Sequence, residues 1–493
     1  MKDRLISILF VIFLILAPIK ATQVIKGVVF EDVNKDGIQQ RNEKSLQNIL
    51  ISDGDTIVKT DIKGMYSLKV SGNSVVFPIL PGDFTLAGNN IISGSFFRVK
   101  TESTELLTHN FPLQRDNNPK KFGVDVIGDV QVKDKEELTF AQHSILSELV
   151  QNKNSEFALF MGDLSNDNDS MLIAIHHLIN FLPIKSYHVM GNHDFDESKP
   201  RTPRLFRSLF GTDVYAFFKG DACFVILNDN DGFKGNIPSS QIRFLKELIK
   251  FIPKTSLLVV SQHVPLDEVS NNGEFLKVIG EHPCLVLSGH THTVHRKIWN
   301  SNVNEWGVGA SCGSWWQGER DYTGIPVSLQ QCGTPRNFYR LFISGNKYEL
   351  KFKGVGLDDN YQMDIKIKGQ DSLDDSIPSL SEIANGCVVA NVYSGCDSTK
   401  VEISIDNGNW LPMKHTEMIA PAVSKIIEWN KKKIYPSKFS TKIPLRKQQS
   451  PHIWTFQLPK NDNNYHILRI RAYDDYGLGK IEQSLVFNLE KNN

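Results

Sequence analysis

The chain has 493 residues, of which 40% are hydrophobic, and its 55 lysines and arginines balance 55 aspartates and glutamates. This length exceeds one ordinary domain, and this composition excludes a largely disordered chain. A formal net charge of zero gives no sign of the basic face with which proteins bind nucleic acids or anionic membrane surfaces. We therefore expect no nucleic-acid partner.

The first residues have the pattern of a secretory signal. Two basic residues within the first four precede an apolar run over residues 5–17, and the small residue Ala21 stands at a suitable cleavage point. An uncleaved anchor is the alternative, but the run is shorter than the about 20 apolar residues that span a bilayer. We predict a signal peptide over residues 1–21, a periplasmic or extracellular location, and no transmembrane segment in the mature chain.

Short apolar runs separated by Gly, Asp and Asn clusters follow and predict an N-terminal β-sandwich domain over residues 22–117. Near its start the sequence fits the calcium-loop pattern D-x-[DN]-x-[DN]-G-x5-E. The expected ligands are Asp32, Asn34, Asp36, the carbonyl of Ile38, and Glu43. A polar turn rich in Asn, Asp and Gly is an equally good interpretation.

From residue 122 the pattern changes to strands alternating with helices. The five apolar runs that predict strands are residues 123–127, 157–161, 187–190, 256–260 and 284–287. Helical periodicity between these runs predicts an α/β layer architecture, which we place over residues 118–364.

Helices become scarce after residue 295. Residues 338–353 predict a hairpin that turns at residues 344–346. We predict a C-terminal β domain over residues 365–493, with one helical stretch at residues 420–429. Cys387 and Cys396 flank an apolar run of this domain and could pair across a hairpin.

Metal-binding residue types follow each of the five apolar runs of the central region. The segments are Gly128-Asp129-Val130-Gln131, Gly162-Asp163-Leu164-Ser165-Asn166-Asp167, Gly191-Asn192-His193-Asp194, Gln262-His263 and Gly289-His290-Thr291-His292. Ligands bind at the carboxyl ends of strands in open α/β sheets, so these segments should converge. One Asp there is usually a turn or cap, and one His is usually a satisfied core residue. The ordered set of five predicts a metal centre.

The expected donors are carboxylates, amides and imidazoles, without a thiolate. This set suits divalent Mn, Fe or Zn. About seven ligands are too many for one ion, so we predict two ions, an arrangement that stabilises both the attacking and the leaving oxygen of a phosphoryl displacement.

The ordered motifs GDxQ, GDxxxD, GNHD, a lone His and GHTH resemble the calcineurin-like metallophosphoesterase superfamily over residues 122–353. Residues 312–326, 333–339, 361–363 and 51–68 are similar to a group of secreted bacterial members. The resemblance implies an α/β (α+β) fold with a β-sandwich core flanked by helices, and all-β N-terminal and C-terminal domains. It also implies a hydrolase that acts on a phosphate mono- or diester.

The resemblance further implies roles for individual residues. Ligands of the two ions fall on Asp129, Gln131 and His292 for the first, on Asn192, His263 and His290 for the second, and on Asp163 as a bridge. His193 falls where the family has a proton donor or transition-state stabiliser. The spacing after Asp163 makes Asp167 its expected partner, with Asn166 as the rival, and Asp194 is expected to hold the turn.

One position departs from the family pattern. The first motif is usually Asp-x-His, whereas this chain has Asp-x-Gln at Gln131. An amide oxygen is a weaker and neutral ligand, so we expect the first ion to bind more loosely or to be a harder ion.

Trp315, Trp316 and Arg320 are the predicted substrate wall, because indole faces stack on sugars or bases and guanidinium groups pair with phosphate. The alternative is that one tryptophan packs in the core, since a strand points neighbouring side chains to opposite faces.

The reaction inferred from the resemblance is hydrolysis by metal-bound hydroxide, with His193 protonating the leaving alkoxide. The expected substrate is a small-molecule, sugar or lipid phosphate ester, and the expected cofactors are two divalent ions (Mn, Fe or Zn), with calcium in the N-terminal domain. The alternative function is that of a catalytically impaired phosphoesterase acting as a surface or carbohydrate-binding protein. A decayed site should lack several ligands, and here only Gln131 is altered. The neutral charge and the signal disfavour a nuclease.

Overall fold

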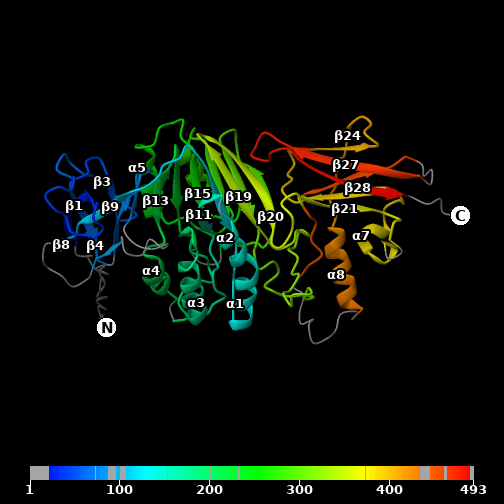
Figure 1. Cartoon of the computed structure of the whole chain (residues 1–493), viewed down its shortest axis with the longest axis horizontal. Helices are drawn as coiled ribbons and strands as arrows, with labels where there is room; N and C mark the ends of the chain where they lie inside the picture. Colours follow the sequence, from blue (N-terminus) through cyan, green and yellow to red (C-terminus); the bar gives the residue numbers. More distant parts are fainter. Residues whose placement is uncertain are drawn as a thin grey trace, which may run out of the picture.

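The structure is a computed structural model that describes residues 22–72, 74–86, 96–99, 107–152, 154–198, 201–230, 234–371, 374–432, 445–459 and 464–488. The predicted signal peptide, residues 1–21, lies outside these ranges. The described chain forms six sheets. The N-terminal strands lie at one end of the molecule, the C-terminal strands at the other, and the central sheets with their helices between them (Figure 1).

Two sheets form the N-terminal end. The first has the order β4-β1-β9-β6, with β8 pairing to β1, and the second has the order β3-β2-β5-β7. The bounds are β1 (Thr22–Glu31), β2 (Leu50–Ser52), β3 (Ile57–Lys59), β4 (Met65–Ser71), β5 (Val75–Ile79), β6 (Phe84–Leu86), β7 (Phe97–Arg98), β8 (Leu107–Thr108) and β9 (Phe111–Arg115). Tyr66, Leu68 and Val70 of β4 are buried while their neighbours face outward, the period-two pattern of a half-buried strand.

The first central sheet carries the earliest predicted ligands. Its order is β12-β11-β10-β19-β20, in which β10, β11 and β12 are parallel and β19 and β20 form the predicted hairpin. The bounds are β10 (Lys121–Ile127), β11 (Ser155–Phe160), β12 (Lys185–His188), β19 (Asn337–Ser344) and β20 (Lys347–Gly354). Beside this sheet lie α1 (Lys135–Ala141), the π-helical segment η2 (Gln142–Leu146), α2 (Ser147–Gln151), α3 (Asp169–Asn180) and α4 (Arg204–Phe210).

The second central sheet has the order β13-β14-β15-β16-β18-β17. The bounds are β13 (Tyr215–Lys219), β14 (Ala222–Ile226), β15 (Leu258–Ser261), β16 (Cys284–Ser288), β17 (Val294–Ile298) and β18 (Val303–Val308), with helices α5 (Ser239–Ile249) and α6 (Asn272–Ile279). Every residue of β14, β15 and β16 is buried, as expected for strands covered on both faces.

Aromatic side chains pack the two central sheets against each other. Phe157 of the first sheet lies 5.2 Å from Phe224 of the second, measured between ring centroids. A separate buried cluster, which includes Leu149, Phe160 and Ile175, lies between the first sheet and its helices. The predicted β-sandwich core flanked by helices is therefore confirmed.

The C-terminal end also has two sheets, with the orders β21-β22-β26-β25 and β24-β23-β27-β28. The bounds are β21 (Met363–Ile367), β22 (Cys387–Val392), β23 (Lys400–Ile405), β24 (Leu411–Pro412), β25 (Lys414–His415), β26 (Ile453–Gln457), β27 (Tyr465–Tyr473), β28 (Ile481–Asn488), η3 (Asp374–Ser376), α7 (Pro378–Ser381) and α8 (Pro421–Lys431). The predicted helix at residues 420–429 is thus present as α8. The boundaries of the three predicted domains stay predictions.

The expected disulfide between Cys387 and Cys396 is wrong. Both residues are buried with free thiols. The apolar run between them is strand β22 itself, so the two cysteines lie at one end of the strand and beyond the other, rather than across a hairpin from each other.

A buried ion pair joins the central and C-terminal sheets. The guanidinium of Arg296, in β17, donates to Asp474 Oδ2 at 2.7 Å and to the carbonyls of Ser394 and Tyr476. Its Cζ lies 3.9 Å from the ring centroid of Trp306. Because both charged side chains are almost fully buried, this contact requires the two regions to be packed together.

Candidate metal centre and active site

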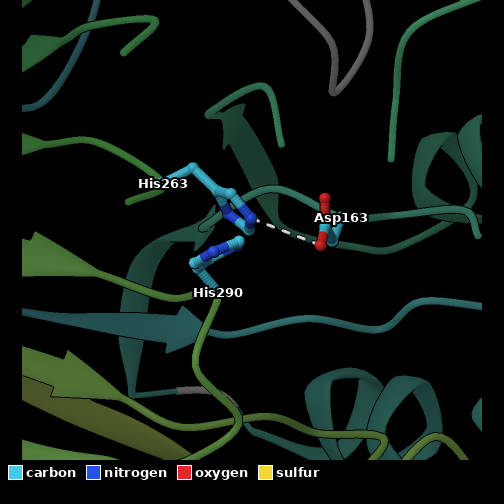
Figure 2. A group of neighbouring side chains, drawn as sticks. All are labelled: Asp163, His263 and His290. Atoms are coloured by element: carbon cyan, nitrogen blue, oxygen red, sulfur yellow. Dashed lines mark ion pairs between the residues drawn. The ribbon is translucent and has the colours of Figure 1, made fainter. Parts of the chain in front are cut away.

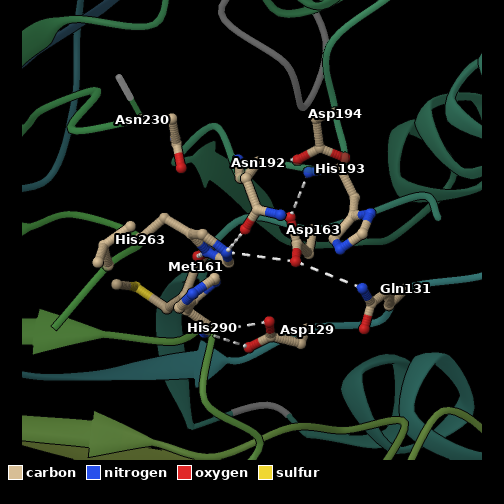
Figure 3. A network of polar contacts seen from close by, with 12 residues as sticks. Asp129, Gln131, Met161, Asp163, Asn192, His193, Asp194, Asn230, His263 and His290 are labelled. Carbon is tan, nitrogen blue, oxygen red and sulfur yellow. Dashed lines mark hydrogen bonds and ion pairs between the residues drawn. The ribbon is translucent and has the colours of Figure 1, made fainter. Parts of the chain in front are cut away.

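The predicted ligands gather at the carboxyl ends of five parallel strands. Asp129 and Gln131 follow β10, Asp163 follows β11, and Asn192 follows β12. From the second sheet, His263 follows β15, and His290 and His292 follow β16. Figure 3 shows side chains from both sheets pointing toward one another around Asp163.

The ligands expected for the second ion lie within coordinating distance of one another. Asp163, His263 and His290 each offer one ligand atom, and these atoms lie within 4.8 Å of one another (Figure 2). His263 Nε2 is 3.3 Å from Asp163 Oδ2 and 3.1 Å from Asn192 Oδ1. Two ligand atoms about 2.1 Å from one ion and at right angles to each other are roughly 3 Å apart. The spacing therefore fits a shared divalent ion.

Gln131, which is expected to bind the first ion, lies across Asp163 from His263 (Figure 3). His292 Nε2 is 3.8 Å from Asp129 Oδ1, and Gln131 Nε2 is 3.4 Å from Asp163 Oδ2. A half-turn of the Gln131 amide would place Oε1, a metal-binding atom, at the same position. Asp163 thus lies between Gln131 and His263, as expected of a bridging carboxylate.

Backbone carbonyls orient two of the imidazoles. His263 Nδ1 bonds to the carbonyl of Met161 at 2.8 Å, and His292 Nδ1 bonds to the carbonyl of Gly313 at 2.6 Å. In each ring this contact leaves Nε2 for an ion, which is the usual arrangement around a metal-bound histidine.

The electrostatics of the site call for positive charge: burial opposes protonation of His263, but the neighbouring Asp163 raises the pKa of His263 to about 10 in the ion-free chain. Burial raises the pKa of Asp129. Burial also opposes ionisation of Asp163, but the attraction of His263 outweighs burial and lowers the pKa of Asp163. Burial lowers the pKa of His290 and of His292 to about 4, so both imidazoles are neutral and can coordinate at neutral pH. Buried carboxylates need compensating charge, and divalent ions would supply it.

The loops that carry the ligands turn through left-handed backbone. Positive φ angles occur at Asp129 (27°), Gln131 (43°), Asp163 (49°), Asp167 (54°), His290 (69°) and His292 (49°). Such conformations are uncommon outside glycine and cluster at functional sites. Gly191, the glycine of the GNHD motif, has no room for a side chain, because a Cβ there would lie 2.1 Å from Asp163 Oδ1.

His193 is held by the carboxylate that the sequence singled out. Its Nδ1 lies 2.7 Å from Asp167 Oδ2, and its backbone N–H donates to Asp163 Oδ1 at 2.8 Å. Asp194 is fully buried and accepts hydrogen bonds from the N–H groups of Leu164, Ser165 and Gly191, so it holds the turn.

The three residues of the predicted substrate wall have different surroundings. Trp315 stacks on His292 with ring centroids 4.4 Å apart. Trp316 is a buried core residue whose Nε1 donates to the carbonyl of Val130 at 2.8 Å. The prediction that Trp316 forms part of the substrate wall is therefore wrong. Arg320 donates to Glu136 at 2.8 Å, which directs its guanidinium toward α1. Trp315 thus contacts a predicted ligand.

Sequence reasoning missed three contributors to the site. Arg201 contacts Asp167, the carbonyl of Gly313 orients His292, and Cys312 Sγ lies 3.8 Å from His292 Nδ1. Arg201 lies in a polar segment without a motif, so no sequence signal marked it. Gly313 and Cys312 lie in the 312–326 stretch already singled out by resemblance.

The predicted calcium loop is a hydrogen-bonded turn. Asp32 accepts from the N–H groups of Lys35 and Gly37, and Glu43 accepts from those of Val33 and Gln40. Within the described ranges, Asp163, His263 and His290 form the only group of three His, Cys, Asp or Glu residues with clustered ligand atoms. Calcium binding by this loop stays a prediction.

None of the helices in the described part of the chain is both long and apolar enough to span a bilayer.

Family models cover most of the chain. Residues 122–294 match the model for calcineurin-like phosphoesterase, residues 33–116 the model for the N terminal of calcineurin-like phosphoesterase, and residues 305–478 the model for its C terminal. None of the curated proteins compared with the sequence matches it significantly.

Three solved structures illustrate the similarity to known folds. A dimetal phosphatase from Danio rerio is 15% identical, with a TM-score of 0.37, over 47% of this chain and 96% of its own. A 5'-nucleotidase from Candida albicans is 12% identical, with a TM-score of 0.28, over 47% of this chain and 51% of its own. A metallophosphoesterase from Sphaerobacter thermophilus is 12% identical, with a TM-score of 0.20, over 46% of this chain and 89% of its own.

Proposed function

Because the chain belongs to the calcineurin-like phosphoesterase family, we propose that it hydrolyses a phosphate mono- or diester at a two-ion centre bridged by Asp163. It is a metal-dependent phosphoesterase, a hydrolase of phosphoric ester bonds. The proposal adds the two-ion centre, the roles of single residues and a small-molecule, sugar or lipid ester as the substrate.

The observation that carries this proposal is the position of Asp163 between two groups of ligands. One group consists of Asn192, His263 and His290, and the other of Asp129, Gln131 and His292. When bound, two divalent ions supply Lewis-acid stabilisation of the phosphoryl oxygens and activate water. Mn, Fe and Zn suit these oxygen and imidazole donors.

The side chains around the centre have their own parts in the proposed reaction. His193, whose Nδ1 is held by Asp167, presents Nε2 to the substrate and protonates the leaving oxygen. Trp315, stacked on His292, forms an apolar wall beside the first ion. The neutral imidazoles of His290 and His292 coordinate without first losing a proton.

The test is to express residues 22–493, measure bound metals by mass spectrometry, and assay p-nitrophenyl phosphate and bis-p-nitrophenyl phosphate with Mn, Zn, Fe and Mg. About two ions per chain and metal-dependent release of nitrophenolate support the proposal. The preferred ester then separates monoester from diester chemistry. A chain that binds no metal and releases no nitrophenolate with any of the four ions contradicts the proposal.

We also propose that the enzyme acts in the periplasm or outside the cell. The support is the basic and apolar pattern of residues 1–21. Cell fractionation of the native host, followed by sequencing of the mature N-terminus, tests this location. A chain that keeps residue 1 and stays in the cytoplasm contradicts it.

Calcium binding by the N-terminal loop is a separate proposal. It rests on the spacing of Asp32, Asn34, Asp36 and Glu43. Calcium added to metal-stripped protein should raise the melting temperature, and an Asp36→Ala variant should lose that rise. No shift in the parent protein contradicts the proposal.

A further inference from the structure

Arg201 lies against the pair formed by His193 and Asp167. Its Nη2 donates to Asp167 Oδ1 at 2.5 Å and to the backbone carbonyl of Asn192 at 3.4 Å. The other carboxylate oxygen, Asp167 Oδ2, is the one 2.7 Å from His193 Nδ1. Arg201 therefore contacts both the partner of His193 and the residue that precedes His193 in the chain.

These contacts add to other hydrogen bonds between the same two loops, among them those of Asp194 with the N–H groups of Leu164 and Ser165. Asp167 lies in the loop after β11, and Asn192 and His193 lie in the loop after β12. Between them the backbone N–H of Asp167 donates to the carbonyl of His193 at 3.2 Å. Asp167 has a φ of 54°, a left-handed conformation that is uncommon outside glycine but that aspartate adopts more often than most residues. The guanidinium of Arg201 is the charged contact to the other end of this side chain.

The orientation of His193 depends on Asp167. Because Nδ1 of His193 is hydrogen-bonded to Asp167 Oδ2, Nε2 is the ring nitrogen that remains to face a bound ester. If Arg201 were absent, Asp167 Oδ1 would lose its charged partner and the carboxylate could rotate about its side-chain bonds toward water. His193 would then lose a fixed direction, although none of its own atoms had changed.

We propose that Arg201 is a positioning residue that fixes Asp167 so that His193 stays aimed at the leaving oxygen of the ester. This inference rests on the proposed function, in which His193 protonates that oxygen. Arg201 itself need not touch the substrate. Its contribution should appear only in reactions that depend on protonation of the leaving group.

A purely structural ion pair is the competing explanation. The side chains of Arg201 and Asp167 are 44% and 47% exposed, and exposed ion pairs contribute little to stability. Loss of Arg201 should therefore leave the melting temperature nearly unchanged. Arg204 offers a matched control, because it lies three residues away, is 81% exposed and pairs with Asp196 instead.

The experiment compares kcat for two phosphate esters that differ only in the leaving group, which is p-nitrophenol in one and phenol in the other. The protein consists of residues 22–493 loaded with Mn. Nitrophenolate leaves readily without a proton, whereas phenolate, a stronger base, is helped by one. We expect Arg201→Gln to lower kcat about tenfold for the phenyl ester and less than about threefold for the p-nitrophenyl ester. Arg201→Lys should recover part of the loss, and Arg204→Gln should change neither rate.

A double-mutant cycle then asks whether Arg201 acts through His193. His193→Ala should lower kcat for the phenyl ester about a hundredfold, and adding Arg201→Gln should lower it no further. Equal losses on both esters, or multiplied losses in the double variant, would overturn the inference. If the parent protein hydrolyses neither ester, the proposed function fails instead, and the two failures are distinguished by the parent alone.

Discussion

The indole of Trp315 stacks on the imidazole of His292, with ring centroids 4.4 Å apart and an angle of 28° between the ring planes. The same imidazole is held at Nδ1 by the carbonyl of Gly313. Two groups from one loop therefore set the direction of a ligand that belongs to another loop. The loop after residue 309 thereby holds a predicted ligand in place although it supplies none itself.

Substitution of Trp315 should weaken the first ion selectively. Trp315→Ala removes an aromatic contact of about 0.5–1.5 kcal/mol, so the Kd of the first ion should rise about two- to tenfold while that of the second stays constant. Isothermal titration with Mn measures both. Trp316→Ala is the contrasting variant: it empties a buried site and should lower the free energy of unfolding by about 3–5 kcal/mol, with both ions still bound. Equal weakening of both ions by Trp315→Ala would contradict this assignment.

Substitutions at Asp163 and Gln131 should have opposite effects on metal binding. Asp163→Asn removes the charge between the two ligand groups and should abolish detectable turnover, with fewer than two ions retained. Gln131→His replaces an amide by an imidazole and should keep or raise the affinity for the first ion. Metal content and kcat of the two variants, measured side by side, check this. Full activity of Asp163→Asn would exclude a bridging role.

Removal of metal should destabilise the chain. Without ions, the carboxylates of Asp129 and Asp163 lose the cations expected to compensate their charge in a buried site. Each ion at a hundred times its Kd should add about 2.7 kcal/mol to the free energy of unfolding. Calorimetry of chelator-treated protein, before and after Mn is restored, measures the difference. When Mn is restored, the Asp163→Asn variant should show a much smaller rise in the free energy of unfolding than the parent protein. An equal rise in both proteins would mean that the ions bind elsewhere.

Stability should fall in acid because of His188, a buried histidine at the end of β12 that is not among the predicted ligands. Burial, with a smaller contribution from His176, lowers the pKa of His188 to about 3. The unfolded chain takes up this proton below about pH 6.5 and the folded chain does not, so stability decreases as the pH falls from 6.5 toward 3. At pH 5 the loss is about 2 kcal/mol.

A variant without that proton site separates this effect from the rest of the acid response. His188 packs between Phe160 and Phe210, so His188→Phe keeps a planar ring in place. The decrease in the free energy of unfolding between pH 7.5 and pH 5 should shrink by about 2 kcal/mol. His177→Phe, at an exposed position of α3, should leave it unchanged. An unaltered pH dependence in His188→Phe would refute the explanation.

The sequence predicted which side chains gather at the candidate site because their positions follow from local rules. A buried strand followed at once by Gly-Asp, Gly-Asn-His or Gly-His predicts a ligand at the strand's carboxyl end, and parallel pairing brings such ends together. Asp167 was found in the same way, from its spacing after Asp163. The hairpin at residues 338–353 and helix α8 were equally local patterns.

The remaining contacts depend on how distant segments pack. Arg201 reaches Asp167 across 34 positions of the sequence, and the turn that carries it has no repeating pattern. Trp315 and Trp316 are neighbours with nearly equal φ angles, yet one ring faces a ligand and the other enters the core. Cys387 and Cys396 could not be placed from the sequence, because only the structure shows that the apolar run between them is a single strand.

The ion pair between Arg296 and Asp474 has a consequence for the ancestry of this arrangement. Both side chains are almost fully buried, and a buried charge without its partner is strongly destabilising. A recombination event that joined this central region to an unrelated C-terminal region would have had to bring an acid to the place of Asp474. The central and C-terminal regions are therefore expected to have been inherited together.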